Sequence, residues 1–369
     1  MLFKSIILIL LLSTLVYIRG FDQNRADSKN IKFVLSMGAG WNLGNSLDSH
    51  GSEPGSRAIK EYETYWGNPT VDRKTILAIR DAGFSTVRIP VTWYEHMDKD
   101  GNIDPAWMDR VNEVADYVLD SGMYAIINIH HDNWTQPTAA NEKNANRLIE
   151  KVWKQIAQRF AGYDEHLIFE SMNEPRLVGT DFEWNEGTPE ARKIVNKYNQ
   201  TFVDAVRGVA GNETRYLMIT PYGGSAEKEA LEDLIIPDDE NIIVTVHTYK
   251  PYGFTHDENS TEVWASSNAE DTLEIDTIIA DLRTRFIDNG IPVIIGEFGA
   301  IDKNNTEFRV EYTKYFVSEA RRNNMMCIWW DDGGREEKKE RFAIFDRYNN
   351  EFFFPEIADA ILSEYKAHE

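Results

Sequence analysis

The sequence predicts an α/β protein in which eight parallel strands, each followed by a helix, close into one (β/α)8 barrel. Three observations lead to this prediction. Short apolar runs of strand length alternate with longer stretches whose apolar residues recur at helical spacing. No Ser/Pro-rich spacer and no short repeat interrupts the alternation after residue 30. Polar residues follow nearly every apolar run, as expected where barrel strands end at a functional face.

The predicted strands are short and rich in apolar residues. In chain order they are Ala39–Leu43, Ser85–Pro90, Tyr124–Ile129, Leu167–Met172, Tyr216–Thr220, Ile242–His247, Pro292–Gly296 and Met325–Trp330. Because a helical stretch separates each strand from the next, the strands are expected to pair in parallel.

The helical stretches are amphipathic. In residues 71–83 the apolar residues recur at helical spacing, charges occupy the opposite face, and Gly83 ends the pattern. Similar patterns cover Ala106–Asp120, Asn146–Phe160, Pro189–Val209, Ala226–Leu234, Leu273–Asp288, Glu307–Arg322 and Pro355–Tyr365. A doubly wound open sheet is the alternative, but no Gly-rich phosphate turn follows the first strand. We therefore expect a single-domain TIM barrel.

The N-terminus has the pattern of a secretory signal peptide. Lys4 precedes an apolar run from Ile6 to Ile18, which is short for a bilayer span, and Arg19-Gly20 follows it. We expect residues 1–20 to be the signal and residues 21–369 to be the catalytic domain of a secreted protein. An uncleaved membrane anchor is the alternative. Cys327 is the single cysteine, so no intrachain disulfide can form and stability must come from the core.

Composition narrows the class of partner. The 369 residues are 42% hydrophobic and 27% charged, which is typical of a soluble globular protein. The formal net charge of −22 argues against nucleic acid or an anionic membrane, because phosphate groups require a basic surface. A neutral or cationic substrate is expected instead.

Two glutamates follow predicted strands. The fourth strand ends in Asn173-Glu174-Pro175, and Glu297 follows the seventh. In a barrel these side chains face each other across one mouth. Two close carboxyl groups in a partly dry cleft do not ionise together, so one takes a raised pKa and can act as a general acid while the other stays anionic. A retaining glycosidase needs such a pair at roughly 5 to 5.5 Å, whereas an inverting one needs about 6.5 to 9.5 Å.

Other strand ends carry side chains that suit the same chemistry. Arg88 could keep the nucleophile ionised, and Asn173 could donate to a sugar 2-hydroxyl. His130 and His247 offer neutral hydrogen bonds, and the Tyr249 hydroxyl could position the nucleophile. Tryptophans near strand ends could stack on sugar rings. These are Trp66, Trp93, Trp134, Trp184, Trp264 and Trp330.

Each of these residues also has a plain structural interpretation. His130-His131-Asp132 could bind a metal, although no third His and bridging Lys lie nearby. Arg88 could form an ordinary buried ion pair. His247 and Tyr249 could satisfy each other. Asn45 could be a turn residue, and a single Trp is more often core than substrate contact.

Eight short motifs, in order, resemble glycoside hydrolase family 5, a family of retaining barrel enzymes rich in endoglucanases. They are Gly40-Trp-Asn-Leu-Gly-Asn45, Trp66-Gly-Asn-Pro69, Val87-Arg-Ile-Pro-Val-Thr-Trp93, Ile127-Asn-Ile-His-His-Asp132, Asn173-Glu-Pro175, His247-Thr-Tyr249, Gly296-Glu-Phe-Gly299 and Trp329-Trp-Asp331. The resemblance implies that Glu174 is the acid/base and Glu297 the nucleophile. It implies substrate contacts for Arg88, Asn173, His247, Tyr249 and Trp330, and for His130, His131 or both.

The resulting expectation is a secreted, retaining endo-glycosidase that hydrolyses β-1,4-glucosidic bonds in cellulose or related β-glucans. Asn45 and Trp264 are expected to add substrate contacts. No cofactor or metal is expected, the partner is the polysaccharide, and the chain is expected to be a monomer. The alternatives are a xyloglucanase, mannanase or xylanase on the same barrel, a non-catalytic glycan-binding barrel, and a metal-dependent barrel hydrolase.

Overall fold

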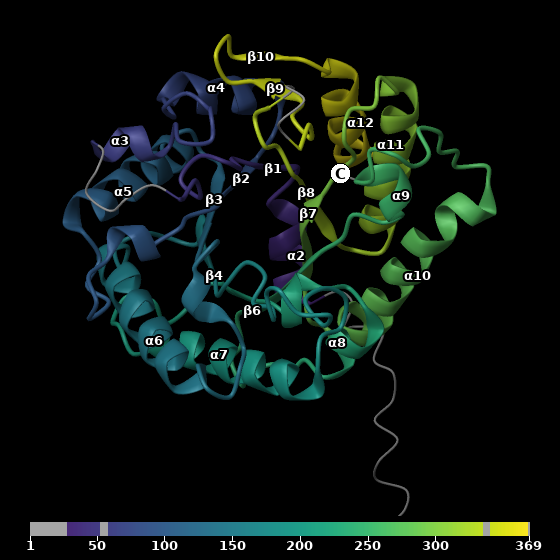
Figure 1. Ribbon diagram of the computed structural model, residues 1–369. Coiled ribbons are helices and arrows are strands. Elements are labelled where there is room, and N and C mark those ends of the chain that lie inside the picture. The colour runs from purple at the N-terminus through teal and green to yellow at the C-terminus, as the bar shows by residue number, and fades with distance from the viewer. Residues whose placement is uncertain (1–27, 52–57, 335–339, 368–369) are drawn as a thin grey trace, which may run out of the picture.

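The computed structural model describes residues 28–51, 58–334 and 340–367. The predicted signal segment, residues 1–20, therefore lies outside the described residues. Eight parallel strands pair in chain order and the eighth closes onto the first, which confirms the (β/α)8 barrel. Figure 1 shows the helices as a ring around these strands.

All eight predicted strands are present, most of them a little shorter than expected. Their bounds are β1 Gly40–Asn42, β2 Thr86–Ile89, β3 Tyr124–Asn128, β4 Leu167–Glu170, β5 Leu217–Ile219, β6 Ile242–His247, β7 Val293–Phe298 and β8 Met326–Trp329. Strand β7 differs in the other direction, because it continues through Glu297 to Phe298. The candidate nucleophile is thus part of the barrel wall.

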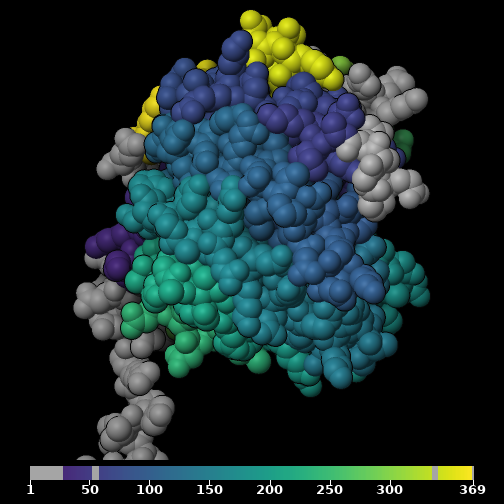
Figure 2. Space-filling view, turned by 90° about the vertical axis from the view of Figure 1, so that its left-hand side faces the viewer, coloured from purple at the N-terminus to yellow at the C-terminus, as the bar shows by residue number. Residues whose placement is uncertain are grey.

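The predicted helices form the outer layer. They are α4 Arg73–Ala82, α5 Pro105–Leu119, α6 Glu142–Arg159, α7 Pro189–Arg207, α8 Lys228–Glu232, α10 Ala269–Arg285, α11 Thr306–Arg322 and α12 Pro355–Lys366. Helices α6 and α10 begin about one turn before their predicted starts. Seen from the side, the segments follow one another in chain order around the flank (Figure 2).

A helix that the strand and helix patterns did not predict lies at the barrel centre. Helix α2, Lys29–Ser36, is capped by Ser28 and buries Ile31 and Val34. The Phe33 ring stacks on Tyr216 at the start of β5, with centroids 3.7 Å apart. Figure 1 shows α2 inside the ring of helices. This helix covers the end of the barrel where the strands begin.

The remaining elements are short. They are α3 Ile59–Tyr62, α9 Tyr252–Thr255, four 3-10 turns at Tyr94–His96, Asn133–Thr135, Tyr222–Gly224 and Ile287–Asn289, and the hairpin of β9 Phe345–Asp346 and β10 Glu351–Phe352. Most follow barrel strands on the side where the strands end. Within the described ranges, no helix has the length and hydropathy needed to span a bilayer. Cys327 is a buried free thiol in β8.

Candidate active site

Glu174 and Glu297 meet at the end of the barrel where the strands finish. Glu174 follows β4, and Glu297 lies near the end of β7. One carboxylate oxygen of each, together with a ring nitrogen of His247, lies within 4.8 Å of the other two. Both glutamates line a cleft of about 710 Å³. The strand ends thus bring two carboxylates together in one cavity.

Arg88 in β2 lies beneath this cleft and is fully buried. Its guanidinium donates to both oxygens of Glu170, at 2.6 and 3.1 Å, and to Oε1 of Glu297 at 2.7 Å. It also donates to the side-chain oxygens of Asn42 at 3.0 Å and Asn173 at 2.8 Å. Arg88 therefore forms a buried ion pair with Glu170 and also contacts the candidate nucleophile Glu297, and its role toward the nucleophile stays a prediction.

Because Asn173 gives its oxygen to Arg88, its amide NH2 group is the end that remains for the cleft. Asn173 is buried and lines the cleft beside Glu174. The side chain is thus oriented as a hydrogen-bond donor.

A bulge in β7 aims Glu297 at the cleft. The register of β6 against β7 shifts between Val246 and His247, so that His247 pairs with Glu297. A Cβ atom on Gly296 would lie 2.6 Å from Thr245 Oγ1, which is closer than real Cβ atoms approach. The Gly296 carbonyl accepts a hydrogen bond from Asn42 Nδ2 at 2.9 Å. Gly296 therefore allows the extra residue that turns Glu297 toward His247.

Tyr249 and Arg88 hold the two oxygens of Glu297 from opposite sides. The Tyr249 hydroxyl donates to Oε2 at 2.8 Å, while Arg88 donates to Oε1. Burial and the charge of Glu297 raise the pKa of Tyr249 well above its usual value. Tyr249 therefore stays protonated and acts as a donor, which fixes the rotation of the Glu297 carboxylate.

Glu174 shares a hydrogen bond with His247. Nδ1 of His247 lies 2.8 Å from Oε1 of Glu174, and Arg176 Nη1 lies 3.5 Å from Oε2. Burial alone would raise the pKa of Glu174, but the hydrogen bond from His247 and the charges of His247 and Arg176 outweigh it and lower the pKa. The expectation of a raised pKa for the general acid is therefore not met in the free site.

The imidazole of this pair has the opposite pKa shift. Burial lowers the pKa of His247, yet the charge of Glu297 and the hydrogen bond to Glu174 raise it above its usual value. His247 and Tyr249 do not satisfy each other, since each is bonded to a different glutamate.

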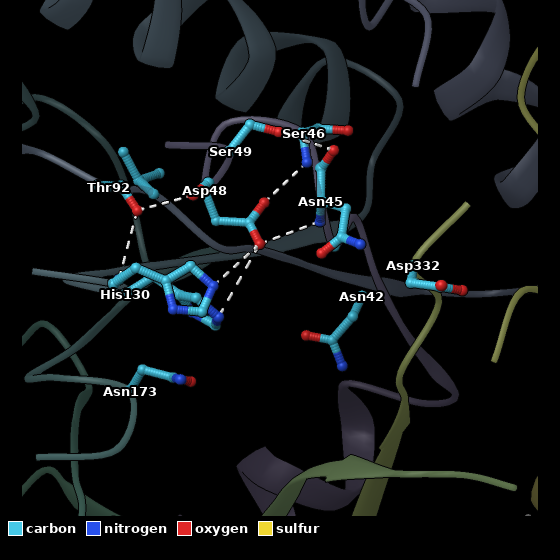
Figure 3. Close-up of polar contacts among 12 residues, drawn as sticks. Asn42, Asn45, Ser46, Asp48, Ser49, Thr92, His130, Asn173 and Asp332 are labelled. Atoms are coloured by element: carbon cyan, nitrogen blue, oxygen red, sulfur yellow. Dashed lines mark hydrogen bonds and ion pairs between the residues drawn. The ribbon is translucent and has the colours of Figure 1, made fainter. Parts of the chain in front are cut away.

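The two adjacent histidines take different positions. The His130 side chain is buried and its ring lies parallel to Trp330, with centroids 5.9 Å apart. His131 is partly exposed and lies against Trp66, at 5.4 Å. Both line the cleft. Figure 3 shows the Asp48 carboxylate pointing toward the His130 ring.

Aromatic rings form the rim and one wall of the cleft. Trp330 lines it near His130, Trp184 is 56% exposed at its rim, and Phe342 packs beside Tyr249. The Arg176 guanidinium lies 4.3 Å from the Trp184 ring. A Cβ atom on Gly44 would lie 2.7 Å from the Trp330 ring, so glycine is required for this close approach. Flat sugar faces can stack on such rings.

The Trp66-Gly-Asn-Pro69 motif supports the cleft through Asn68. Its side-chain amide donates to the carbonyls of Asn45 and Asp332, which follow β1 and β8. Asn45 itself occupies a left-handed turn with φ 56° and donates its backbone N–H to Asp48. Asn45 is not among the residues that line the cleft. The turn interpretation therefore holds for the Asn45 backbone, and the substrate contact of its side chain stays a prediction.

Trp264 is not the substrate contact that the sequence predicted. It is 1% exposed, packs against Phe254, Tyr312 and Tyr315, and donates its indole N–H to the Asp271 carbonyl. The ring therefore belongs to the core between α9, α10 and α11 and does not reach the cleft. Proximity to a strand end in sequence did not distinguish Trp264 from an exposed ring such as Trp184.

Within the described residues, two groups have the spacing of possible metal ligands. One is Glu174 and Glu297 with His247, and the other is Asp48 with His130 and His131. Asp132, the third residue of the His-His-Asp run, is turned away from both histidines. Its carboxylate accepts from the Trp93 backbone and from the Trp134 indole. The run itself is therefore not a ligand cluster.

Several residues of the site were missed at the level of sequence. They are Asn42, Asp48, Asn128, Glu170, Arg176 and Glu340. A signal existed for Glu170, because a charge inside the apolar run Leu167–Glu170 must be paired when the strand is buried. Burial and the nearby Asp332 charge raise the pKa of Glu340 to about 7, and its carboxylate accepts from the Trp330 indole at 3.3 Å. No short-range pattern marked Glu340.

The sequence matches the model of one protein family. Residues 47–336 fit the model described as cellulase, glycosyl hydrolase family 5. The matched range includes Arg88, Glu174 and Glu297, and it covers most of the described barrel.

Characterised proteins are similar over most of this chain. Endoglucanase A of Clostridium longisporum is 41% identical over 346 residues, which are 91% of this chain and 66% of that protein. Cellulase/esterase CelE of Acetivibrio thermocellus is 43% identical over 344 residues, 91% of this chain but 40% of that protein. The chain thus spans less than two thirds of these relatives. A lichenase from Caldicellulosiruptor sp. F32, solved as a mutant with cellotetraose, has a TM-score of 0.87 at 38% identity, covering 90% of this chain and 94% of that one.

Proposed function

We propose, from the premise that this chain belongs to glycosyl hydrolase family 5, that it is a retaining endo-glycosidase acting on β-1,4-glucosidic bonds in cellulose or related β-glucans. Glu174 is the acid/base and Glu297 the nucleophile. Asn173, His130, His131, His247 and Trp330 contact the substrate, while Arg88 and Tyr249 orient the nucleophile.

One observation carries this proposal: the two carboxylates differ in the way they are held. Glu297 is held on both oxygens, by Arg88 and by Tyr249, as a nucleophile must be to approach one carbon atom. Glu174 is bonded to a titratable imidazole that can pass it a proton. One oxygen of each glutamate lies within 4.8 Å of the other, which is compatible with the roughly 5 to 5.5 Å between carboxyl groups of a retaining pair. This spacing supports retention.

The proposed steps follow from these contacts. The proton that resides on His247 moves along the 2.8 Å hydrogen bond to Glu174, which gives it to the leaving oxygen. Glu297 attacks the anomeric carbon as that bond breaks, forming a glycosyl enzyme and releasing the distal part of the glucan. Glu174 then takes a proton from water, and the hydroxyl displaces Glu297 to release the new reducing end.

A neutral glucan suits the charges around the cleft. Glu174, Glu227 and Glu340 line it together with Arg176 and Lys250, so the lining is not basic. The cellotetraose complex of the similar lichenase supports a β-glucan as the bound chain. Xyloglucan, mannan and xylan are the alternative substrates. The two glutamates do not distinguish among these polysaccharides, so hydrolysis assays must.

We also propose that the protein is secreted, that residues 21–369 act as one catalytic domain, and that it works as a monomer without a cofactor or metal. The apolar run in residues 1–20 supports secretion. N-terminal sequencing of protein recovered from the culture medium tests cleavage near Gly20, and light scattering tests the monomer.

The decisive experiment is hydrolysis of a panel of carboxymethyl cellulose, mixed-linkage β-glucan, xyloglucan, mannan and xylan. Wild type is expected to release oligosaccharides from the first two, and the anomer formed first should keep the β configuration. Glu297→Ala is expected to be inactive, and azide should restore turnover by giving the inverted glycosyl azide. Near-full activity of Glu297→Ala would refute the assignment, and chelator-sensitive activity would favour the metal-dependent alternative.

A further inference from the structure

Asn128 and His130 lie two residues apart at the end of strand β3, so their side chains face the same side of the strand. Both are buried. The Asn128 amide nitrogen lies 3.0 Å from Nδ1 of His130. No part of the proposed mechanism uses Asn128, yet it contacts a histidine that lines the cleft.

The backbone of Val91 fixes the orientation of the Asn128 amide. The Val91 N–H group lies 3.1 Å from Asn128 Oδ1. Because a backbone N–H can only donate, the atom facing it must be the amide oxygen, and the end facing His130 must be the NH2 group. An NH2 group can only donate, so Nδ1 of His130 is the acceptor and carries no proton.

Burial and the neighbouring His131 lower the pKa of His130 well below its usual value, so its ring is neutral and holds one proton. That proton must be on Nε2. Nε2 lies 4.0 Å from Oδ2 of Asp48, which is beyond hydrogen-bond distance. The ring lines the cleft parallel to Trp330. The Nε2–H group thus has no acceptor at Asp48.

We propose that Asn128 is a positioning residue that holds His130 in the Nε2–H tautomer, so that His130 donates a hydrogen bond to a sugar oxygen at the floor of the cleft. The sugar as acceptor rests on the proposed function. The tautomer does not, because it follows from Val91, Asn128 and His130 alone.

The same tautomer has a second consequence. Oδ2 of Asp48 lies 4.0 Å from Nε2 of His130 and 3.8 Å from Nε2 of His131, an arrangement that a divalent metal could draw together. A histidine nitrogen must be unprotonated to bind a metal. Asn128 therefore keeps this trio from binding metal and leaves the cleft floor open for substrate.

The tautomer can be measured in the wild-type protein. Nitrogen-15 NMR of the imidazole rings distinguishes the protonated from the bare ring nitrogen, and the chain has 8 histidines. The His130 signals are assigned by their loss in His130→Gln. A proton on Nε2 of His130 at pH 8 supports the proposal, and a proton on Nδ1 overturns it.

Asn128→Asp is the matched variant, because it keeps the shape and still accepts from Val91. A carboxylate also accepts from Nδ1–H, so the His130 proton should move to Nδ1 and Nε2 should become a ligand. Zinc binding measured by calorimetry at pH 8 should then tighten at least about tenfold over wild type. Asn128→Asp/His131→Ala should lose that gain. Equal zinc affinity of wild type and Asn128→Asp would contradict the role given to Asn128.

Kinetics separates this inference from the proposed function. In Asn128→Asp, kcat/KM for the preferred glucan should fall roughly tenfold through the lost donor. If wild type hydrolysed no glycan of the panel, the proposed function would fail while the NMR result would still stand. If wild type were active and His130 carried its proton on Nδ1, this inference alone would fail.

Discussion

Nδ1 of His247 lies 2.8 Å from Oε1 of Glu174, and the pKa values of the two groups move in opposite directions. The pKa of the imidazole is raised and the pKa of the carboxyl is lowered. The two groups, on β6 and on the loop after β4, are therefore placed to share one proton. If Glu174 is the proposed proton donor, its proton comes from the neighbouring imidazole, because the pKa of the carboxyl itself is lowered.

This relationship predicts the pH profile of kcat/KM. The pair must hold one proton to be active, and the raised pKa of His247 places the loss of that proton above pH 6.5. In His247→Asn the proton has only Glu174 to bind, so the alkaline limb should move to lower pH. The limb is measured on one soluble β-glucan at saturating and low concentrations. An unmoved alkaline limb would show that the two groups do not share the proton.

The loss of activity in Glu174→Gln should depend on how acidic the leaving group of the substrate is. An aryl glycoside with an acidic phenol needs no proton donor, so its first step should be nearly unchanged. Hydrolysis of β-glucan should slow by roughly 10²- to 10⁴-fold, because the sugar oxygen must be protonated as it leaves. Glu183→Gln is the control, since Glu183 also contacts Arg176 but lies outside the candidate pair. Equal losses on both substrates would contradict the acid role.

Tyr249→Phe removes the donor to Oε2 of Glu297 without changing the ring. A hydrogen bond to a charged group contributes about 1.5–3 kcal/mol, so kcat should fall roughly 10- to 100-fold as the carboxylate loses its fixed rotation. Tyr163→Phe is the matched control, because its hydroxyl donates to Asp116 at 2.8 Å away from the cleft. The prediction fails if both variants retain wild-type turnover.

Trp264→Ala should change stability, whereas Trp330→Ala should change substrate binding. Trp264 lies in the core, so its truncation should lower the free energy of unfolding by about 3–5 kcal/mol and leave KM unchanged in the folded fraction. Trp330 lines the cleft, so its truncation should raise KM. Denaturant unfolding and glucan kinetics measure the two effects. A raised KM in Trp264→Ala would instead support the substrate contact that the sequence predicted for Trp264.

The buried carboxyl of Asp132 should make the unfolding temperature depend on pH. Burial raises its pKa from 3.8 to about 7 in the folded state. Between these values the folded chain binds more protons than the unfolded chain, so this group lowers stability as pH rises from about 4 to about 7. Asp132→Asn should therefore flatten the fall of the unfolding temperature across that range. Asp109→Asn, at an exposed site on α5, should leave the slope unchanged, and a wild-type slope in Asp132→Asn would refute the argument.

The fold could be predicted because its signals are local. Each strand is a short apolar run, and each helix shows its own 3.6-residue periodicity, so eight pairs could be counted without any long-range contact. Helix α2 escaped because it precedes the first strand and belongs to no such pair. Strand β7 was predicted too short because Glu297 is polar yet lies within the barrel wall.

Part of the candidate site could likewise be predicted from the sequence, and part could not. The sequence by itself determined that Arg88, His130, Asn173, Glu174, His247, Tyr249, Glu297 and Trp330 come together, because parallel barrel strands end at one face. Only the tertiary structure decided that Arg88 binds Glu170 as well as Glu297, that Trp264 is core, and that Asn128 controls the His130 tautomer. These outcomes depend on distances between residues far apart in the chain or on the direction of one side chain, and neither is encoded in local periodicity.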